Sequence, residues 1–301
     1  MNEGSKKAIM AALFANGGIT IAKFVGYTLT GAASMLAEAV HSAADTGNQA
    51  LLLLGASRAA RLPTPEHPFG YGRERYFWAF IVSLVIFLLG GVFAIYEGLH
   101  KLGDPHGLES PEVGVAILFV AALLEGWSFR TAILQARPLK GDSTWWEFVR
   151  HTKAAELPVV LLEDLGALLG LLFALCGLGL AMVTGDPRFD AIGSIAVGVL
   201  LTIIAVVLSI EMRSLLVGES ASDDAIAKIR DALGEDGKIT RVIHMRTTHL
   251  GPDELLVGAK VELDAALTFT EVADAINAAE DRVRQRVPSA RVIYVEPDIA
   301  R

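Results

Sequence analysis

The chain has 301 residues, of which 52% are hydrophobic, and its mean hydropathy is positive. Long apolar runs cause this composition, and they exclude an ordinary soluble protein in favour of an integral membrane protein. The single cysteine, Cys176, excludes a disulfide framework and, inside an apolar run, is expected to be a small packing residue.

Six segments are long and apolar enough to cross a hydrocarbon core, which takes roughly 20 residues. They lie near residues 8–30, 32–56, 76–99, 112–135, 156–182 and 188–211. The first is expected to be a retained span, because a short apolar core with a small-residue cleavage site does not follow MNEGSKKAIM. The sequence thus predicts an all-α six-helix transmembrane domain over residues 1–212.

Lysine and arginine are unevenly distributed between the two sides of these spans. One side carries only Lys101 and Arg188 in its connections. The other side carries Lys6, Lys7, Arg58, Arg61, Arg73, Arg75, Arg137, Lys140, Arg150, Lys153 and Arg213. By the positive-inside rule the second side is cytoplasmic, which places both the N- and the C-terminus in the cytoplasm.

Residues 213–301 have a soluble composition, with 12 Lys/Arg and 16 Asp/Glu. A helix is expected over 222–234, with Ser222 as its N-cap, and a second over 270–287, beginning with Thr270. Alternating apolar residues predict strands over 239–248, 254–264 and 291–297. The order αββαβ predicts a small α+β, ferredoxin-like cytoplasmic domain.

Polar residues interrupt the second span, 36-LAEAVHSAADTGNQALLLLG-55. His41 and Asp45 are four residues apart and so share one helix face, with Glu38 and Asn48 three residues to either side. An imidazole and a carboxylate one turn apart can bind a divalent cation together, or they can form a hydrogen-bonded pair that only packs the bundle. Ionisable residues at membrane depth are costly, which favours a functional role.

A second polar pair, Glu163 and Asp164, lies in the fifth span, 159-VVLLEDLGALLG-170. Neighbouring helical residues point about 100° apart, so both carboxylates cannot aim equally well at one point. One is then a ligand, and the other orients it, carries a proton or faces a vestibule. The alternative is a carboxylate pair at the helix end near the interface, which the preceding Pro158 would fit.

Three stretches together carry a resemblance to a known family: 41-HSAADTGNQALLLLG-55, 67-HPFGYGRERYFWAF-80 and 158-PVVLLEDLGALLG-170. The chain resembles the cation diffusion facilitators, in particular the branch with the mitochondrial member of the animal zinc-transporter series and its bacterial relatives. The resemblance covers nearly the whole chain. It implies a homodimer in the lipid bilayer that exchanges divalent cations for protons by alternating access and exports them from the cytoplasm.

The resemblance also implies a transport site made of two pairs of ligands with four-residue spacing. His41 and Asp45 match the first pair, and Asp164 matches the second member of the second pair. Its first member is replaced by Val160, so Glu163 is the expected substitute, with Asn48 or water as the other option. One nitrogen and several oxygens suit Zn²⁺ and exclude Mn²⁺, Fe²⁺ or Co²⁺ less than two histidines would.

The other histidines are not expected to bind metal. Tyr71 stands where a partner for His67 is often found, and the partners of His244 are replaced by Lys260 and Val295. Helix capping or packing is the expected role of Glu125 and Asp190, with proton access as the alternative.

Two other functions compete with transport. A metal-dependent intramembrane enzyme would use the same residues, but the sequence has no HExxH pair and no activated nucleophile. A membrane metal sensor or scaffold would act through the tail. No prosthetic group and no nucleic-acid partner are expected, because the chain has no cofactor loop and no basic patch with interleaved aromatic residues. A bacterial inner membrane is the expected location.

Overall fold

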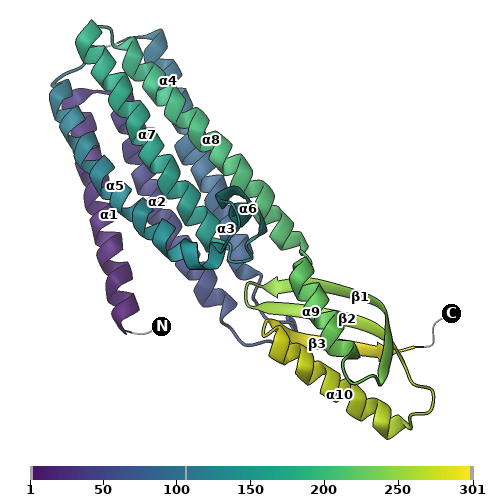
Figure 1. The fold of residues 1–301 in the computed structure, drawn as a ribbon. Coiled ribbons are helices and arrows are strands. Elements are labelled where there is room, and N and C mark those ends of the chain that lie inside the picture. Colours follow the sequence, from purple (N-terminus) through teal and green to yellow (C-terminus); the bar gives the residue numbers. More distant parts are fainter. Residues whose placement is uncertain (1–2, 106, 299–301) are drawn as a thin grey trace. The chain divides into compact units, whose positions relative to one another are not determined.

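The computed structural model describes residues 3–105 and 107–298, with side chains from residue 16 onward (Figure 1). Lys6 and Lys7, which support the predicted orientation, lie outside the described side chains. The chain forms two compact units: residues 1–56 with 77–212, and residues 57–76 with 213–301. The tail unit therefore includes the connection between the second and third predicted spans.

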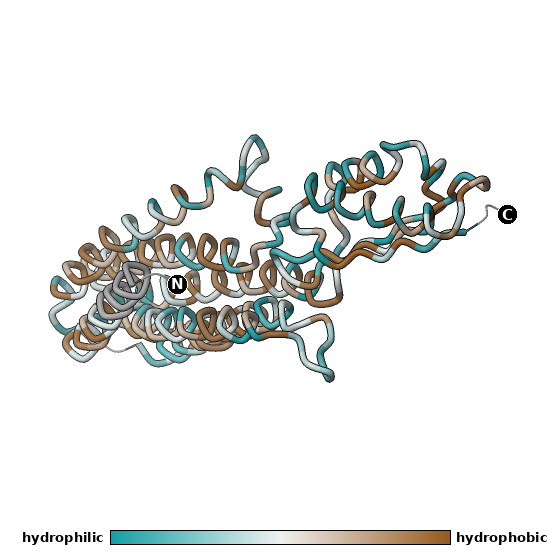
Figure 2. Tube along the Cα trace, turned by 90° about the horizontal axis from the view of Figure 1, so that it is seen from below, coloured by the Kyte–Doolittle hydropathy of each residue, from teal (hydrophilic) through white to brown (hydrophobic). Residues whose placement is uncertain are grey.

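The first unit is a bundle of long helices, which run side by side in Figure 1. Its elements are α1 (Glu3–Thr30), α2 (Ala33–Ala59), α3 (Glu74–Val85), the π-helical η1 (Ile86–Val92), α4 (Phe93–Gly103), α5 (Pro111–Lys140), α6 (Trp145–His151), α7 (Glu156–Thr184) and α8 (Arg188–Val217). Apolar residues cover most of these helices in Figure 2, whereas the tail helices alternate between apolar and polar.

Four helical segments among the described residues are long and apolar enough to span a membrane: Glu74–Gly103, Pro111–Lys140, Glu156–Thr184 and Arg188–Val217. They confirm a helical transmembrane domain and match the last four predicted spans, each with ends shifted by a few residues. Exposed leucine, isoleucine and phenylalanine side chains on these helices provide a lipid-facing surface.

Three local predictions were wrong or incomplete. The third span is not a continuous α-helix, because the π-helical turn η1, which contains Gly90 and Gly91, interrupts it. The short helix α6 was missed, although Thr144 and Glu147 form a capping box at its start. Cys176 is exposed on α7 instead of packing inside the bundle; an apolar run cannot tell a lipid-facing position from a buried one.

The tail has the predicted order of elements: α9 (Asp223–Gly234), β1 (Ile239–Gly251), β2 (Glu254–Leu263), α10 (Phe269–Arg286) and β3 (Ala290–Pro297). The sheet order is β1-β2-β3, with β1 antiparallel to β2 and β2 parallel to β3. Ser222 caps α9 as predicted, by accepting from the backbone N–H of Ala225. The helix α10 instead begins after Thr268, because the Thr268–Glu271 spacing forms the capping box.

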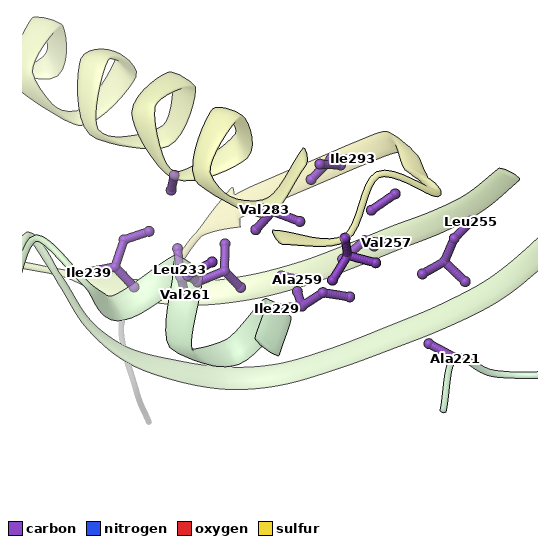
Figure 3. Close-up of a cluster of buried hydrophobic side chains, with 14 residues drawn as sticks. Ala221, Ile229, Leu233, Ile239, Leu255, Val257, Ala259, Val261, Val283 and Ile293 are labelled. Atoms are coloured by element: carbon purple, nitrogen blue, oxygen red, sulfur yellow. The ribbon is translucent and has the colours of Figure 1, made fainter. Parts of the chain in front are cut away.

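An apolar core joins the helices and the sheet of the tail (Figure 3). The helices α9 and α10 contact each other and both supply core residues, so they cover the same face of the sheet. The core includes Ile229, Leu233, Ile239, Val257, Val261, Val283 and Ile293.

The 57–76 connection packs against this tail. Arg75 lies 3.3 Å from Asp253 in an ion pair. Gly72 touches the turn after β1 so closely that a Cβ atom there would lie 2.6 Å from the carbonyl oxygen of Leu250. Any other residue at position 72 would push the two backbones apart.

Candidate metal centre

The polar residues of α2 point into the bundle. Glu38, His41 and Asn48 are fully buried, and Asp45 is 9% exposed. The polar stripe of the second span therefore does not meet lipid, as the cost of ionisable groups in a hydrocarbon core requires.

His41 and Asp45 approach each other across one helical turn. Nδ1 of His41 lies 3.4 Å from Oδ1 of Asp45. Both ring nitrogens of His41 and this oxygen of Asp45 lack a hydrogen-bond partner among the described residues. The ring faces the π-helical segment, where a Cβ atom on Gly90 would lie 3.6 Å from Nδ1. Buried polar atoms without partners are costly, and here they are two ligand types that a divalent cation could satisfy.

Glu163 and Asp164 of α7 have different hydrogen-bond partners, in agreement with their adjacency in the helix. Oε1 of Glu163 accepts a hydrogen bond of 2.8 Å from the side-chain amide of Asn48. Asp164 instead accepts a bond of 3.1 Å from the hydroxyl of Ser128 on α5. Asn48 keeps a buried Oδ1 that has no partner among the described residues, so its carbonyl oxygen is also available to a cation.

A small polar pocket, here called the acidic pocket, lies between the four helices α1, α2, α5 and α7 around these carboxylates. It is lined by Asn16, Ile19, Ser42, Asp45, Gln49, Glu125, Glu163 and Asp164. Glu125, for which packing was expected, is thus a fourth carboxylate on the pocket wall. Nothing in its local sequence distinguishes a pocket-lining position from a packing one.

The predicted ligands are neighbours, but they do not form a closed shell. His41 does not line the acidic pocket, and no three His, Cys, Asp or Glu residues of the described chain are close enough together to hold one metal ion. Val160, which replaces a ligand in the matching pattern, packs against an apolar cluster that contains Phe148 and Leu161. The described residues therefore lie near one another without forming a complete metal-binding shell.

Lys23 is the charged residue of this region that sequence reasoning missed. It is fully buried in α1, and its ammonium lies 3.0 Å from Oε2 of Glu38 and 2.6 Å from Oγ of Ser42. A lysine in the middle of the apolar run ITIAKFVGY is the signal that could have revealed it.

Asp190 has a capping role, though for a different helix from its own. At the start of α8 it accepts bonds from the backbone N–H groups of Ala33 and Ser34, which begin α2, and from the hydroxyl of Ser34. Lys101 of α4 lies 3.3 Å from the same carboxylate. The first turn of α2 is thereby fixed to α4 and α8.

Two histidines of the second unit, His67 and His244, have close neighbours in the structure. His67 packs edge-on against Tyr71, with ring centroids 4.6 Å apart. His244 pairs in register with Lys260, whose ammonium binds Asp298 and Glu296. Hydrogen bonds to these two carboxylates raise the pKa of Lys260 and keep a cation beside His244. Val295, which pairs with Ala259, has no side-chain atom that could bind a metal.

Comparison with known proteins identifies this arrangement. Residues 9–217 match the model of the cation efflux transmembrane domain, and residues 221–298 match that of the cation efflux protein cytoplasmic domain. The chain belongs to the cation efflux family. The resemblance to the cation diffusion facilitators is thus confirmed, and the bundle and the tail are the two domains of this family.

Several named relatives support the assignment. The chain is 33% identical over 265 residues to the mitochondrial proton-coupled zinc antiporter SLC30A9 of Mus musculus, which covers 87% of this chain and 47% of that protein. Metal tolerance protein C4 of Arabidopsis thaliana is 30% identical over 270 residues, 88% of this chain and 59% of that protein. The cation-efflux pump FieF of Serratia proteamaculans is 26% identical over 289 residues, 96% and 91% of the two chains. This cation efflux chain therefore spans about half the length of its mitochondrial relatives.

Proposed function

We propose that the chain exports divalent metal cations, with Zn²⁺ as the preferred ion, in exchange for protons. The observation that carries the proposal is the buried His41, whose ring nitrogens lack partners among the described residues, beside Asp45 and opposite the carboxylates of α7. A zinc antiporter and a cation-efflux pump among the relatives support the class of substrate.

The proposed ligands are His41, Asp45 and Asp164, with Glu163 or Asn48 completing the shell. A metal ligand must be unprotonated, so protons and metal compete for these groups. Metal entering from the cytoplasm displaces protons, and protons from the other side then displace the metal. The bundle alternates between the two accesses, and closing the shell brings His41 and α7 toward Asp45.

The same proposal extends to architecture. Six spans, counting α1 and α2, place both termini in the cytoplasm, and the αββαβ tail has a ferredoxin-like fold that joins two copies as a homodimer. The bundle binds the ion and the tail dimerises. A bacterial inner membrane is the proposed location; the Serratia pump, which matches 96% of this chain, is a bacterial relative. Labelling a single cysteine at position 104, in a Cys176-free background, from the cytoplasmic side alone would contradict this topology.

The decisive experiment is metal flux in liposomes. Purified protein is reconstituted with a Zn²⁺ indicator and a pH indicator inside, and only Zn²⁺ and a pH gradient are supplied. Asp45→Ala and Asp164→Ala should each abolish Zn²⁺ flux and the coupled proton movement, because each removes a ligand that both ions use. Asp142→Asn, at an exposed loop position, is the control and should leave both fluxes unchanged. Wild-type flux in both alanine variants would contradict the proposed site.

Two further variants decide which group completes the shell. Glu163→Gln keeps an oxygen that can accept from Asn48 but loses the charge. If Glu163 is the ligand, Zn²⁺ affinity should fall as far as it does in Asp164→Ala, and Asn48→Ala should have little effect. If Asn48 is the ligand, Asn48→Ala should strongly lower Zn²⁺ affinity and Glu163→Gln should have little effect. Calorimetric titration of Zn²⁺ measures both.

The alternative functions make different predictions in the liposome assay. An intramembrane hydrolase or a metal sensor would bind Zn²⁺ without moving it across the bilayer. Zn²⁺ binding without metal-driven proton flux would therefore support one of them. The match of residues 9–217 to a cation efflux domain favours transport over both.

A further inference from the structure

The ion pair of Lys23 and Glu38 is built into the wall of the proposed transport site. Both side chains are fully buried, and the pair links α1 to α2. The ammonium of Lys23 also donates to Ser42, which lines the acidic pocket. A buried ion pair contributes little net stability compared with apolar residues of the same size, so its retention calls for a reason other than stability.

Helical spacing places this pair directly next to the pocket. Glu38, Ser42, Asp45 and Gln49 follow one another at intervals of four, three and four residues, and therefore share one face of α2. The last three line the acidic pocket. Glu38 thus lies one helical turn beyond the pocket, on the same face.

Glu38 has an unused oxygen on the bundle side. Its Oε2 binds Lys23, but its Oε1 is buried and has no partner among the described residues. This oxygen lies against α7, where a Cβ atom on Gly170 would be 2.6 Å away. The carboxylate therefore keeps a free acceptor one turn from a pocket that is proposed to hold a cation.

The charges of the region are unbalanced without Lys23. Asp45, Glu125, Glu163 and Asp164 line the pocket, and no basic residue is among its described lining. Lys23 cancels the charge of Glu38 and so keeps a fifth carboxylate out of the cation's surroundings. Glu38 in turn cancels an ammonium that would repel a divalent ion.

We propose that Lys23 and Glu38 form a charge-balanced clasp that sets the affinity and selectivity of the transport site. This inference rests on the proposed function. Neither residue is a ligand: Lys23 acts by withholding Glu38 from the cation, and Glu38 acts by neutralising Lys23. Additional carboxylate oxygen favours Mn²⁺ relative to Zn²⁺, so the clasp favours Zn²⁺.

The test is whether divalent-ion affinity rises or falls when the charge of Lys23 or of Glu38 is removed. Glu38→Gln leaves an uncompensated ammonium and should weaken Zn²⁺ binding. Lys23→Met leaves an uncompensated carboxylate and should tighten divalent-ion binding, more for Mn²⁺ than for Zn²⁺. Charges one turn apart, about 5–6 Å, act strongly enough in a protein interior for each change to reach about tenfold. Titration of detergent-purified protein with Zn²⁺ or Mn²⁺ alone at neutral pH measures both.

A double variant and a second ion pair serve as controls. Lys23→Met combined with Glu38→Gln removes both charges and should bind Zn²⁺ within about threefold of the wild type, since the opposed effects of the two charges on the cation cancel. Lys101→Met and Asp190→Asn break a second buried ion pair, away from the acidic pocket, and should leave the Zn²⁺ affinity of folded protein unchanged. If Glu38→Gln does not fold, Glu38→Asp, which shortens the carboxylate, should shift affinity in the same direction by a smaller factor.

The possible results separate this inference from the proposed function. Loss of Zn²⁺ binding in Asp45→Ala shows that the site is where we propose. If that holds but the two single variants fail to shift affinity in opposite directions, the clasp is only structural and this inference is wrong. If Asp45→Ala binds Zn²⁺ as well as the wild type, the proposed site itself is wrong.

Discussion

Two buried lysine–carboxylate pairs among the described residues of the bundle differ in how many of their carboxylate oxygens have hydrogen-bond partners. Asp190 receives bonds on both oxygens, from Lys101, from Ser34 and from two backbone N–H groups. Lys101 also donates to the carbonyl oxygen of Gly31 at 2.5 Å. Glu38, in contrast, binds Lys23 through one oxygen and leaves the other without a partner among the described residues.

This difference separates a structural pair, Lys101–Asp190, from the pair that we propose tunes the transport site, Lys23–Glu38. Asp190 caps a helix that begins next to Lys101, and each of its bonds satisfies a group that would otherwise be orphaned. Glu38 caps no helix and lies in the second turn of α2, one turn beyond the acidic pocket. The hydrogen bonds on both oxygens of Asp190 hold the helices together. The unpaired oxygen of Glu38 lies near the acidic pocket, where its charge can act on a bound cation.

The largest expected effect is on the structural pair. Asp190→Ala leaves Lys101 buried and removes the cap of α2, so it should lower the free energy of unfolding by about 3–5 kcal/mol. Thermal unfolding in detergent measures the change, with the exposed Asp142→Asn as the matched control. A change below about 1 kcal/mol would remove the distinction between the two pairs.

A glycine next to Glu38 gives a smaller and more selective effect. Gly170→Ala would place a Cβ atom 2.6 Å from Oε1 of Glu38, and overpacking of this kind costs about 1–3 kcal/mol. Because Glu38 must move, Zn²⁺ affinity should fall as well. Gly179→Ala in the same helix has open space and should be neutral or slightly stabilising. Equal Zn²⁺ affinity in both variants would show that the position of Glu38 is irrelevant to binding.

The smallest expected effect compares two hydroxyls. Ser34 donates to Asp190 and Ser42 accepts from Lys23, so Ser34→Ala and Ser42→Ala should each cost about 1 kcal/mol of stability. Only Ser42→Ala should also change Zn²⁺ affinity, because it loosens Lys23 beside the pocket. Parallel unfolding and titration measurements test the pair, and an affinity change in Ser34→Ala would contradict the comparison.

Helical periodicity predicted two local features of the proposed site. The four-residue spacing of His41 and Asp45 placed them together, and the adjacency of Glu163 and Asp164 predicted that they diverge. The order of helices and strands in the tail was predicted, since its apolar residues alternate in the strands and recur at helical spacing in the helices. These patterns involve residues of one helix or one strand, so the sequence alone shows them.

The features that the sequence did not predict depend on contacts between residues far apart in the chain. The partner of Lys23 lies 15 residues away on another helix, and Asp190 caps a helix that begins 157 residues earlier. No spacing rule links such positions. Gly90 of the π-helical turn also packs against a distant residue, because Leu201 of α8 occupies the space that a side chain at position 90 would need.

The 57–76 connection has a consequence for the order in which the chain can fold. Arg75 meets Asp253 across 178 residues of sequence. At about 5–20 residues per second, the ribosome needs roughly 10–35 s to make that stretch. During this interval the connection has no sheet to pack on, while the helices on either side of it are already entering the bilayer. The tail unit therefore completes its fold only after nearly the whole protein has been synthesised, and early termination would leave this segment open to proteases.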